Sequence, residues 1–155
     1  GAAVARGALA ARLRWSTPRA LARWAARPEL AKAACGRAGE ELAARALAAD
    51  GVRLIGRRLV CGPAEVDLVG LESDGVLVVF EVKSGRVPAS GVLRHRPGSH
   101  LGPAQLARLV RAARMLTKAR GARGWRVELV EVLLHPAAAA VERRTLVSQA
   151  TLRAE

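Results

Sequence analysis

Four side chains near the middle of the chain have types and spacing that can do chemistry together: Glu65, Asp67, Glu81 and Lys83. They lie on two apolar segments joined by a short turn-forming stretch, which predicts an antiparallel hairpin. Carboxylates that meet on one face of a hairpin repel each other unless a cation lies between them. Because Mg²⁺ and Mn²⁺ prefer such oxygen ligands, the pattern predicts a divalent-metal site.

The register of the hairpin decides whether these side chains meet. A three-residue loop that ends with Gly75 in the left-handed conformation pairs residues whose numbers sum to 148. Asp67 then faces Glu81. In the same register Glu65 faces Lys83, and since side chains alternate faces with a period of two, all four project from one side.

The residues between the charged positions are apolar and predict a core on the opposite face: Val66, Leu68, Val78, Phe80 and Val82. A solvated hairpin whose charges merely form cross-strand pairs is the simpler alternative. The charged face, however, also carries apolar residues, namely Val69, Leu71, Leu77 and Val79. Charges embedded in apolar surface favour a functional site over a solvated face.

Glu40 adds a third carboxylate from a predicted helix over residues 36–49. It shares a helix face with Ala43, Ala44 and Leu47, at the spacings that place residues on the side facing the core. Its neighbour Glu41 instead has Arg45 four residues further on, a typical solvent-side pair. Glu40 is therefore expected to point toward the sheet.

The other patterns predict an α/β domain with a mixed sheet, in which a three-strand antiparallel meander and a crossover strand are flanked by helices. The expected strands are 52–60, 64–71, 76–83 and 126–134, with an edge strand at 141–147, and the expected second helix is 103–119 after a loop over 84–102. Residues 1–35 form a basic Ala/Arg-rich extension, partly helical at best, and 36–155 form the domain.

The formal net charge of the 155-residue chain is +13, which favours a nucleic-acid partner. The alternative is compositional bias, because Ala is abundant and all but three of the 26 basic residues are Arg. The two cysteines have no metal-binding spacing and are expected to be reduced thiols in a cytoplasmic protein. No apolar run reaches the roughly 20 residues of a membrane-spanning helix. The oligomeric state is open, a homodimer included.

Asp67, thirteen intervening residues and Glu81-Val82-Lys83 resemble the D…(D/E)-x-K signature of the restriction-endonuclease-like superfamily. More narrowly, the motifs at 36–40, 64–69 and 79–83 are similar to those of the YraN-like family of small bacterial proteins. The resemblance covers about residues 36–135 and implies an endonuclease-like fold.

The resemblance further implies hydrolysis of DNA phosphodiester bonds with Mg²⁺ or Mn²⁺, on structured or repair-related DNA. Asp67, Glu81 and the backbone carbonyl of Val82 would bind the metal, and Glu40 would bind it through water or set the geometry. Lys83 would orient or deprotonate the attacking water, or offset charge on the phosphate. Glu65 would be an outer group of the site, or only a salt-bridge partner of Lys83.

Basic and polar residues of the long loop and the second helix are candidates for contact with phosphates: Arg86, Arg94, Arg96, Gln105, Arg108 and Arg111. Gln105 stands about where the family has a basic residue. The alternative is a solvated helix face and a mobile loop. Two further functions stay open: a non-catalytic nucleic-acid-binding module, and an interaction protein whose acidic patch docks a basic partner.

Overall fold

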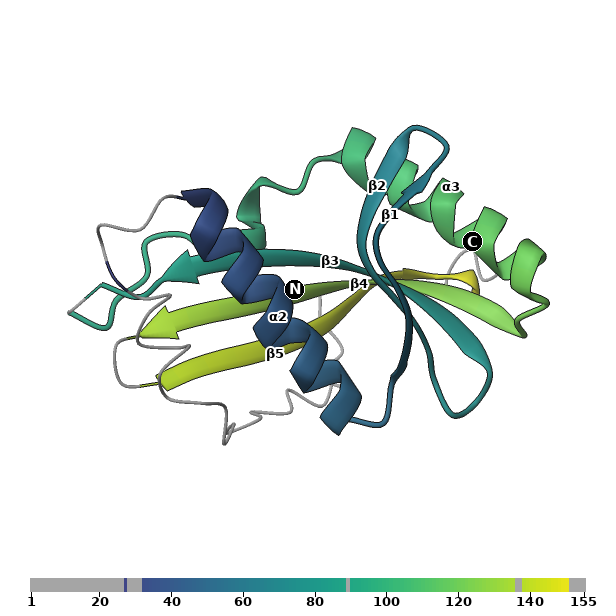
Figure 1. The fold of residues 1–155 in the computed structure, drawn as a ribbon. Helices are drawn as coiled ribbons and strands as arrows, with labels where there is room; N and C mark the ends of the chain where they lie inside the picture. Colours follow the sequence, from purple (N-terminus) through teal and green to yellow (C-terminus); the bar gives the residue numbers. More distant parts are fainter. Residues whose placement is uncertain (1–26, 28–31, 89, 136–137, 151–155) are drawn as a thin grey trace.

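The computed structural model describes residue 27 and residues 32–88, 90–135 and 138–150. The elements in chain order are α2 (Lys32–Ala49), β1 (Arg53–Cys61), β2 (Ala64–Leu71), β3 (Val76–Arg86), the 3₁₀ turn η1 (Pro97–His100), α3 (Pro103–Arg120), β4 (Gly124–His135) and β5 (Ala138–Ser148) (Figure 1). The predicted basic extension lies almost wholly outside the described residues, so its conformation stays a prediction.

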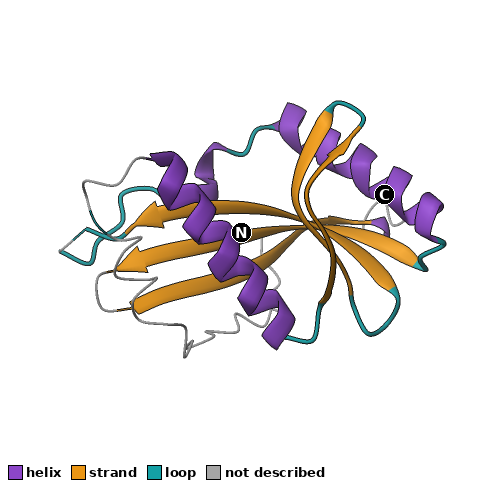
Figure 2. Ribbon diagram, in the orientation of Figure 1, coloured by secondary structure: helices purple, strands orange, loops and turns teal. Residues whose placement is uncertain are grey.

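The five strands form one mixed sheet in the order β1-β2-β3-β4-β5, with α2 and α3 packed against it (Figure 2). All neighbouring pairs are antiparallel except β3 and β4, which are parallel and are joined through α3. A parallel pair needs such a crossover connection. The predicted α/β class, with its meander and crossover strand, is confirmed.

Each helix covers a different face of the sheet. Side chains of α2 pack in one core with Leu68, Phe80 and Val130, whereas those of α3 pack in a second core with Val69 and Val79. Neighbouring residues of one strand thus belong to different cores, as the alternation of a strand requires. No helix within the described ranges combines the length and apolar character needed to cross a membrane.

The β2–β3 turn has the predicted form. Gly75 is left-handed, with a φ of 84°, and Glu72 donates its N–H to the carbonyl of Val76 at 3.0 Å. The pairs from Leu71 with Leu77 to Leu68 with Phe80 have numbers that sum to 148. The predicted register is therefore confirmed along this part of the hairpin.

The β2–β3 ladder ends at the pair of Leu68 and Phe80, earlier than expected. Beyond this point β2 stays paired with β1, where Glu65 pairs with Val60, and Val66 packs in the α3 core instead of the α2 core. Two expectations are thus wrong, because both assumed an unbroken ladder. Val66 does not share the face of Leu68, and Glu65 is not paired with a β3 residue.

Several elements are longer than predicted. Helix α2 begins at Lys32, four residues before the expected start, so it crosses the predicted domain boundary at 35/36. Strand β3 continues to Arg86 because its parallel pairing with β4 continues to Leu134. The sequence pattern did not show this extension, since the partner strand lies about 50 residues away.

Two buried glutamates of β4 hold neighbouring segments in place. Glu128 accepts two hydrogen bonds from Arg143 of β5, at 3.2 and 3.0 Å. Glu131 accepts from the Arg96 side chain at 2.9 Å and from the Gly98 N–H at 3.0 Å. A buried carboxylate needs such partners to offset its lost hydration. The pairs fasten β5 and η1 to β4.

Helix α2 approaches β3 closely at Gly39, next to Glu40. A Cβ atom on Gly39 would lie 1.7 Å from the Oγ and 2.8 Å from the Cβ of Ser84. Only glycine allows this approach, so the helix position depends on it. Gly36, in the same helix, has no atom within 4 Å of its equivalent point.

We expect Gly39→Ala to lower the free energy of unfolding by roughly 1–3 kcal/mol, because the methyl group forces α2 away from Ser84. Gly36→Ala, the matched control, should instead raise it by up to about 1 kcal/mol through helix propensity. Urea unfolding monitored by circular dichroism measures both. Equal effects of the two substitutions would contradict the close contact.

Candidate active site

Asp67 occupies the point where β2 separates from β3. Glu72 and Val76 form a hydrogen-bonded pair, and such pairs recur at every second residue of an antiparallel ladder. In a continuous ladder the N–H of Val82 would therefore donate to the carbonyl of Val66. Instead it donates to Oδ2 of Asp67, at 2.8 Å. A side-chain carboxylate thus replaces a backbone acceptor at the split.

Glu81 is held by two donors beside this point. Its side chain is buried, and Oε1 accepts a hydrogen bond from Nε2 of Gln105 at 2.7 Å. The ammonium of Lys83 lies 3.2 Å from the same oxygen, and its side chain remains one-third exposed. Gln105, which the sequence suggested as a phosphate contact, therefore fixes a carboxylate of the candidate site.

Glu40 pairs with an arginine, and its charge acts on Asp67. Its Oε2 lies 2.9 Å from Nε of Arg58 on β1. Glu41, as predicted, pairs with Arg45, and it also contacts Arg57 at 2.9 Å. Two neighbouring glutamates of α2 thus form ion pairs with two neighbouring arginines of β1. The pair of Glu40 and Arg58 is the one that involves a candidate site residue.

The electrostatics of Asp67 show how the charged groups act on one another. Burial and then the charge of Glu81 raise its pKa from 3.8 to about 7. The hydrogen bond from Val82 opposes the shift, the charge of Glu40 adds to it, and Lys83 lowers the pKa. Close carboxylates cannot all stay ionised without a compensating cation. The structure therefore brings Asp67 and Glu81 together with Lys83, and Glu40 is near enough for its charge to act on Asp67.

The free oxygens indicate what the site can bind. Oδ1 of Asp67 and Oε2 of Glu81 make no hydrogen bond to any residue the structure describes. Oxygen atoms suit hard divalent cations, and Mg²⁺ characteristically binds one or two carboxylates and keeps several waters. Across residues 32–88, 90–135 and 138–150 no three His, Cys, Asp or Glu side chains are gathered to hold a metal. Asp67 and Glu81 thus offer an ion two carboxylates rather than a full set of protein ligands.

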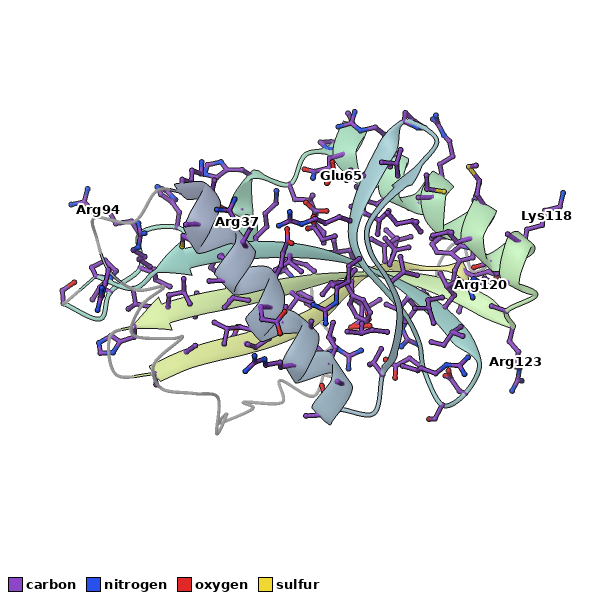
Figure 3. The ribbon with its side chains drawn as sticks, in the orientation of Figure 1. Arg37, Glu65, Arg94, Lys118, Arg120 and Arg123 are labelled. Atoms are coloured by element: carbon purple, nitrogen blue, oxygen red, sulfur yellow. The ribbon has the colours of Figure 1, made fainter. Side chains whose placement is uncertain are left out.

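Glu65 makes no hydrogen bond or ion pair with these residues. Its side chain is exposed on the outer part of the β1–β2 hairpin (Figure 3), and it has no hydrogen bond or ion pair with any described residue. The predicted pair with Lys83 is therefore wrong. The cause is the split of the ladder, after which β2 follows β1 rather than β3.

The predicted phosphate contacts do not form one group. Arg96 is paired with Glu131 and Glu142, so it fastens the loop. Arg94 is exposed at the end of the molecule far from Lys118 of α3 (Figure 3). Arg86, at the end of β3, is half-buried.

Arg108 and Arg111 are exposed on α3, the helix that carries Gln105. Of the six predicted phosphate contacts, Arg108 and Arg111 are therefore the two that lie exposed on a helix that contacts the candidate site, through Gln105.

Sequence reasoning missed Arg58. The only signal was a pair of arginines on a predicted strand together with a pair of glutamates on a predicted helix. Their register could not be read, because a β-bulge shifts the β1–β2 pairing between Leu54 and Gly56.

We expect metal-free protein to lose stability as pH rises from about 4 to about 7, the range between the unfolded and folded pKa values of Asp67. The raised pKa means that the folded state prefers protonated Asp67, so the stabilisation is complete below this range and is lost above it. Asp67→Asn keeps an acceptor for Val82 without the charge. In EDTA it should melt several degrees above wild type at pH 8 and close to it at pH 4.5.

Glu65→Gln is the control for this measurement, because Glu65 is exposed and is not among the groups that shift the pKa of Asp67. Its melting temperature should follow that of wild type at both pH values. If Asp67→Asn melted equally far below wild type at both pH values, this would contradict the claim that the buried charge of Asp67 destabilises the folded protein.

Comparison with known proteins adds a family. The model described as "Uncharacterised protein family UPF0102" matches residues 39–132, which include Glu40, Asp67, Glu81 and Lys83. This span reaches from the close approach of α2 to the crossover strand β4. The match thus covers the part of the fold that builds the candidate site.

Individual proteins of the same family are also similar in sequence to this chain. A UPF0102 protein of Streptomyces griseus is 38% identical over 107 residues, which cover 67% of this chain and 86% of the relative. One from Streptomyces coelicolor is 40% identical over 108 residues, covering 67% and 79%. One from Arthrobacter is 43% identical over 83 residues, covering 54% and 66%. Together with the fold, these matches show that the chain belongs to UPF0102, the YraN family of the restriction-endonuclease-like superfamily.

Proposed function

We propose that this protein hydrolyses phosphodiester bonds of DNA with Mg²⁺ or Mn²⁺. The observation that carries the proposal is the carboxylate of Asp67 at the strand split, beside the buried carboxylate of Glu81. Family membership and the oxygen-only donor set support it. Structured or repair-related DNA is the proposed substrate class.

Asp67, Glu81 and the backbone carbonyl of Val82 would hold the ion, and Glu40 would reach it through water. A divalent ion held by these residues would polarise the scissile phosphate and lower the pKa of a bound water. Gln105 keeps Oε1 of Glu81 occupied and so leaves its other oxygen available to an ion. Such outer hydrogen bonds orient metal ligands.

Lys83 is suited to act on the water or the phosphate. Its ammonium is anchored 3.2 Å from Glu81 yet one-third exposed, so it can meet a substrate that approaches from solvent. A positive charge there offsets negative charge that builds on the phosphate during hydrolysis. It can also orient the attacking water, or take its proton once the ammonium has lost its own.

Helix α3 supplies a surface for the duplex. Arg108 and Arg111 are exposed on the helix whose first turn carries Gln105, so positive charge extends along α3 from the site. Arg114, on the same helix, lies with its guanidinium 5.7 Å from the ring of Trp125. Contacts of arginines with phosphates position a duplex without reading its sequence.

A non-catalytic DNA-binding module is the second candidate. It is favoured by the finding that no three metal-binding side chains gather within the described ranges. Such a module would keep the positive charge of α3 and bind DNA equally well with or without a divalent ion. Cleavage assays separate the two functions.

We expect wild-type protein with Mn²⁺ or Mg²⁺ to cut at least one member of a panel of linear, flapped, forked and four-way DNAs. Asp67→Ala, Glu81→Ala and Lys83→Ala should each reduce the rate by roughly 100-fold or more, since each removes a group that stabilises the transition state. Glu41→Ala and Glu65→Ala are the controls and should keep the activity. Equal residual cleavage by wild type and all variants would show that a contaminant cuts the DNA, and it would refute the proposed nuclease activity.

We further expect the double substitution Arg108→Ala/Arg111→Ala to weaken DNA binding and to reduce the slope of log affinity against log salt by about 2, one for each lost phosphate contact. Fluorescence anisotropy in EDTA over a salt series measures this slope. Arg120→Ala/Arg123→Ala removes the same charge at the far end of α3 (Figure 3) and is the control. Equal losses in both proteins would mean that only net charge matters.

A further inference from the structure

Arg58 has an unusual backbone for its residue type. It lies within β1 at a φ of 46°, and it is the one non-glycine residue with a positive φ among the described residues. This left-handed conformation costs free energy for residues with a Cβ atom, and it persists where the surrounding structure imposes it. The reason should therefore be found in what surrounds Arg58.

Arg58 lies directly across from the candidate site. The β1–β2 pairs on either side of it have residue numbers that sum to 125, which places Arg58 opposite Asp67. Asp67 is itself the point at which β2 leaves β3. Arg58 and Asp67, which lie opposite each other on β1 and β2, thus both depart from regular strand geometry.

The side chain of Arg58 is the counter-ion of Glu40. The ion pair is 2.9 Å long, the arginine side chain is half-exposed, and the glutamate side chain is one-quarter exposed. Glu40 in turn acts electrostatically on Asp67. A guanidinium keeps its charge at every accessible pH, so it is a permanent cation at the edge of the carboxylate group.

We infer that Arg58 is a positioning residue that holds Glu40 in metal-free protein and competes with a divalent ion for it. The inference rests on the proposed function, because it assigns Glu40 to the same ion. Two cations that share a carboxylate repel each other, and the repulsion lowers the affinity of the second. Metal binding therefore requires Glu40 to turn from the guanidinium toward the ion or its water.

Arg57 offers a matched control. It is the preceding residue of β1, it pairs with Glu41 at the same distance of 2.9 Å, and its side chain is similarly exposed, 55% against 50%. Its substitution removes the same charge, but its partner Glu41 is not one of the groups that act on Asp67. A difference between the two arginines thus reports on position rather than on net charge.

The test is calorimetric titration of Mn²⁺ alone into full-length protein without DNA. We expect Arg58→Ala to bind Mn²⁺ roughly tenfold more tightly than wild type, because Glu40 no longer has to leave a guanidinium partner to interact with the ion. Arg57→Ala should change the affinity less than about twofold, and Arg58→Lys, which keeps the charge, should stay near wild type. A merely structural arginine would not tighten metal binding when removed.

Two further variants keep the result interpretable. Arg58→Gly removes the guanidinium and accepts the left-handed backbone without strain, so it should fold at least as well as Arg58→Ala and bind Mn²⁺ as tightly. In a Glu40→Gln background the gain from Arg58→Ala should largely disappear, because the competition acts through Glu40.

The outcomes separate this inference from the proposed function. Equal affinities of wild type, Arg58→Ala and Arg57→Ala would overturn the role of Arg58 and leave the metal site standing. A full gain in the Glu40→Gln background would also overturn it. A wild-type protein that binds no Mn²⁺ would refute the proposed function and the inference together.

Discussion

The hydrogen bond from the N–H of Val82 to the carboxylate of Asp67 is the interaction on which the site depends. A buried backbone donor must find a partner, and β2, the strand that would supply it, has separated from β3 at this point while staying paired with β1. The carboxylate satisfies the donor, and it is thereby held beside Glu81 in a partly buried place. The raised pKa of Asp67 follows from that placement.

Both helices then meet the sheet around this bond. Gly39 lets α2 approach Ser84, which brings Glu40 to the carboxylates from one side. The first turn of α3 reaches Glu81 through Gln105. The packing of Gly39 against Ser84 thus positions Glu40, and the hydrogen bond from Gln105 positions Glu81, both relative to the point where β2 separates from β3. Membership in UPF0102 is consistent with a shared scaffold of this form.

The sequence predicted the parts that depend on local geometry. A glycine turn set the register near the turn, alternation placed the apolar positions, and helix spacing turned Glu40 inward. The split was not predictable, because a period of two carries no sign of where a ladder ends. Glu65 was therefore misplaced. Arg58 and Arg96 were misjudged for a related reason: a bulge hides the partner of one, and a distant buried glutamate holds the other.

The central claim is that Asp67 and Glu81 share one divalent ion. Diffraction from crystals soaked in Mn²⁺, collected near the manganese absorption edge, tests it directly. The account predicts one anomalous peak roughly 2 Å from a carboxylate oxygen of each residue, and no peak there in Asp67→Asn crystals. A strong peak elsewhere, or full Mn²⁺ binding by Asp67→Asn, would contradict the account.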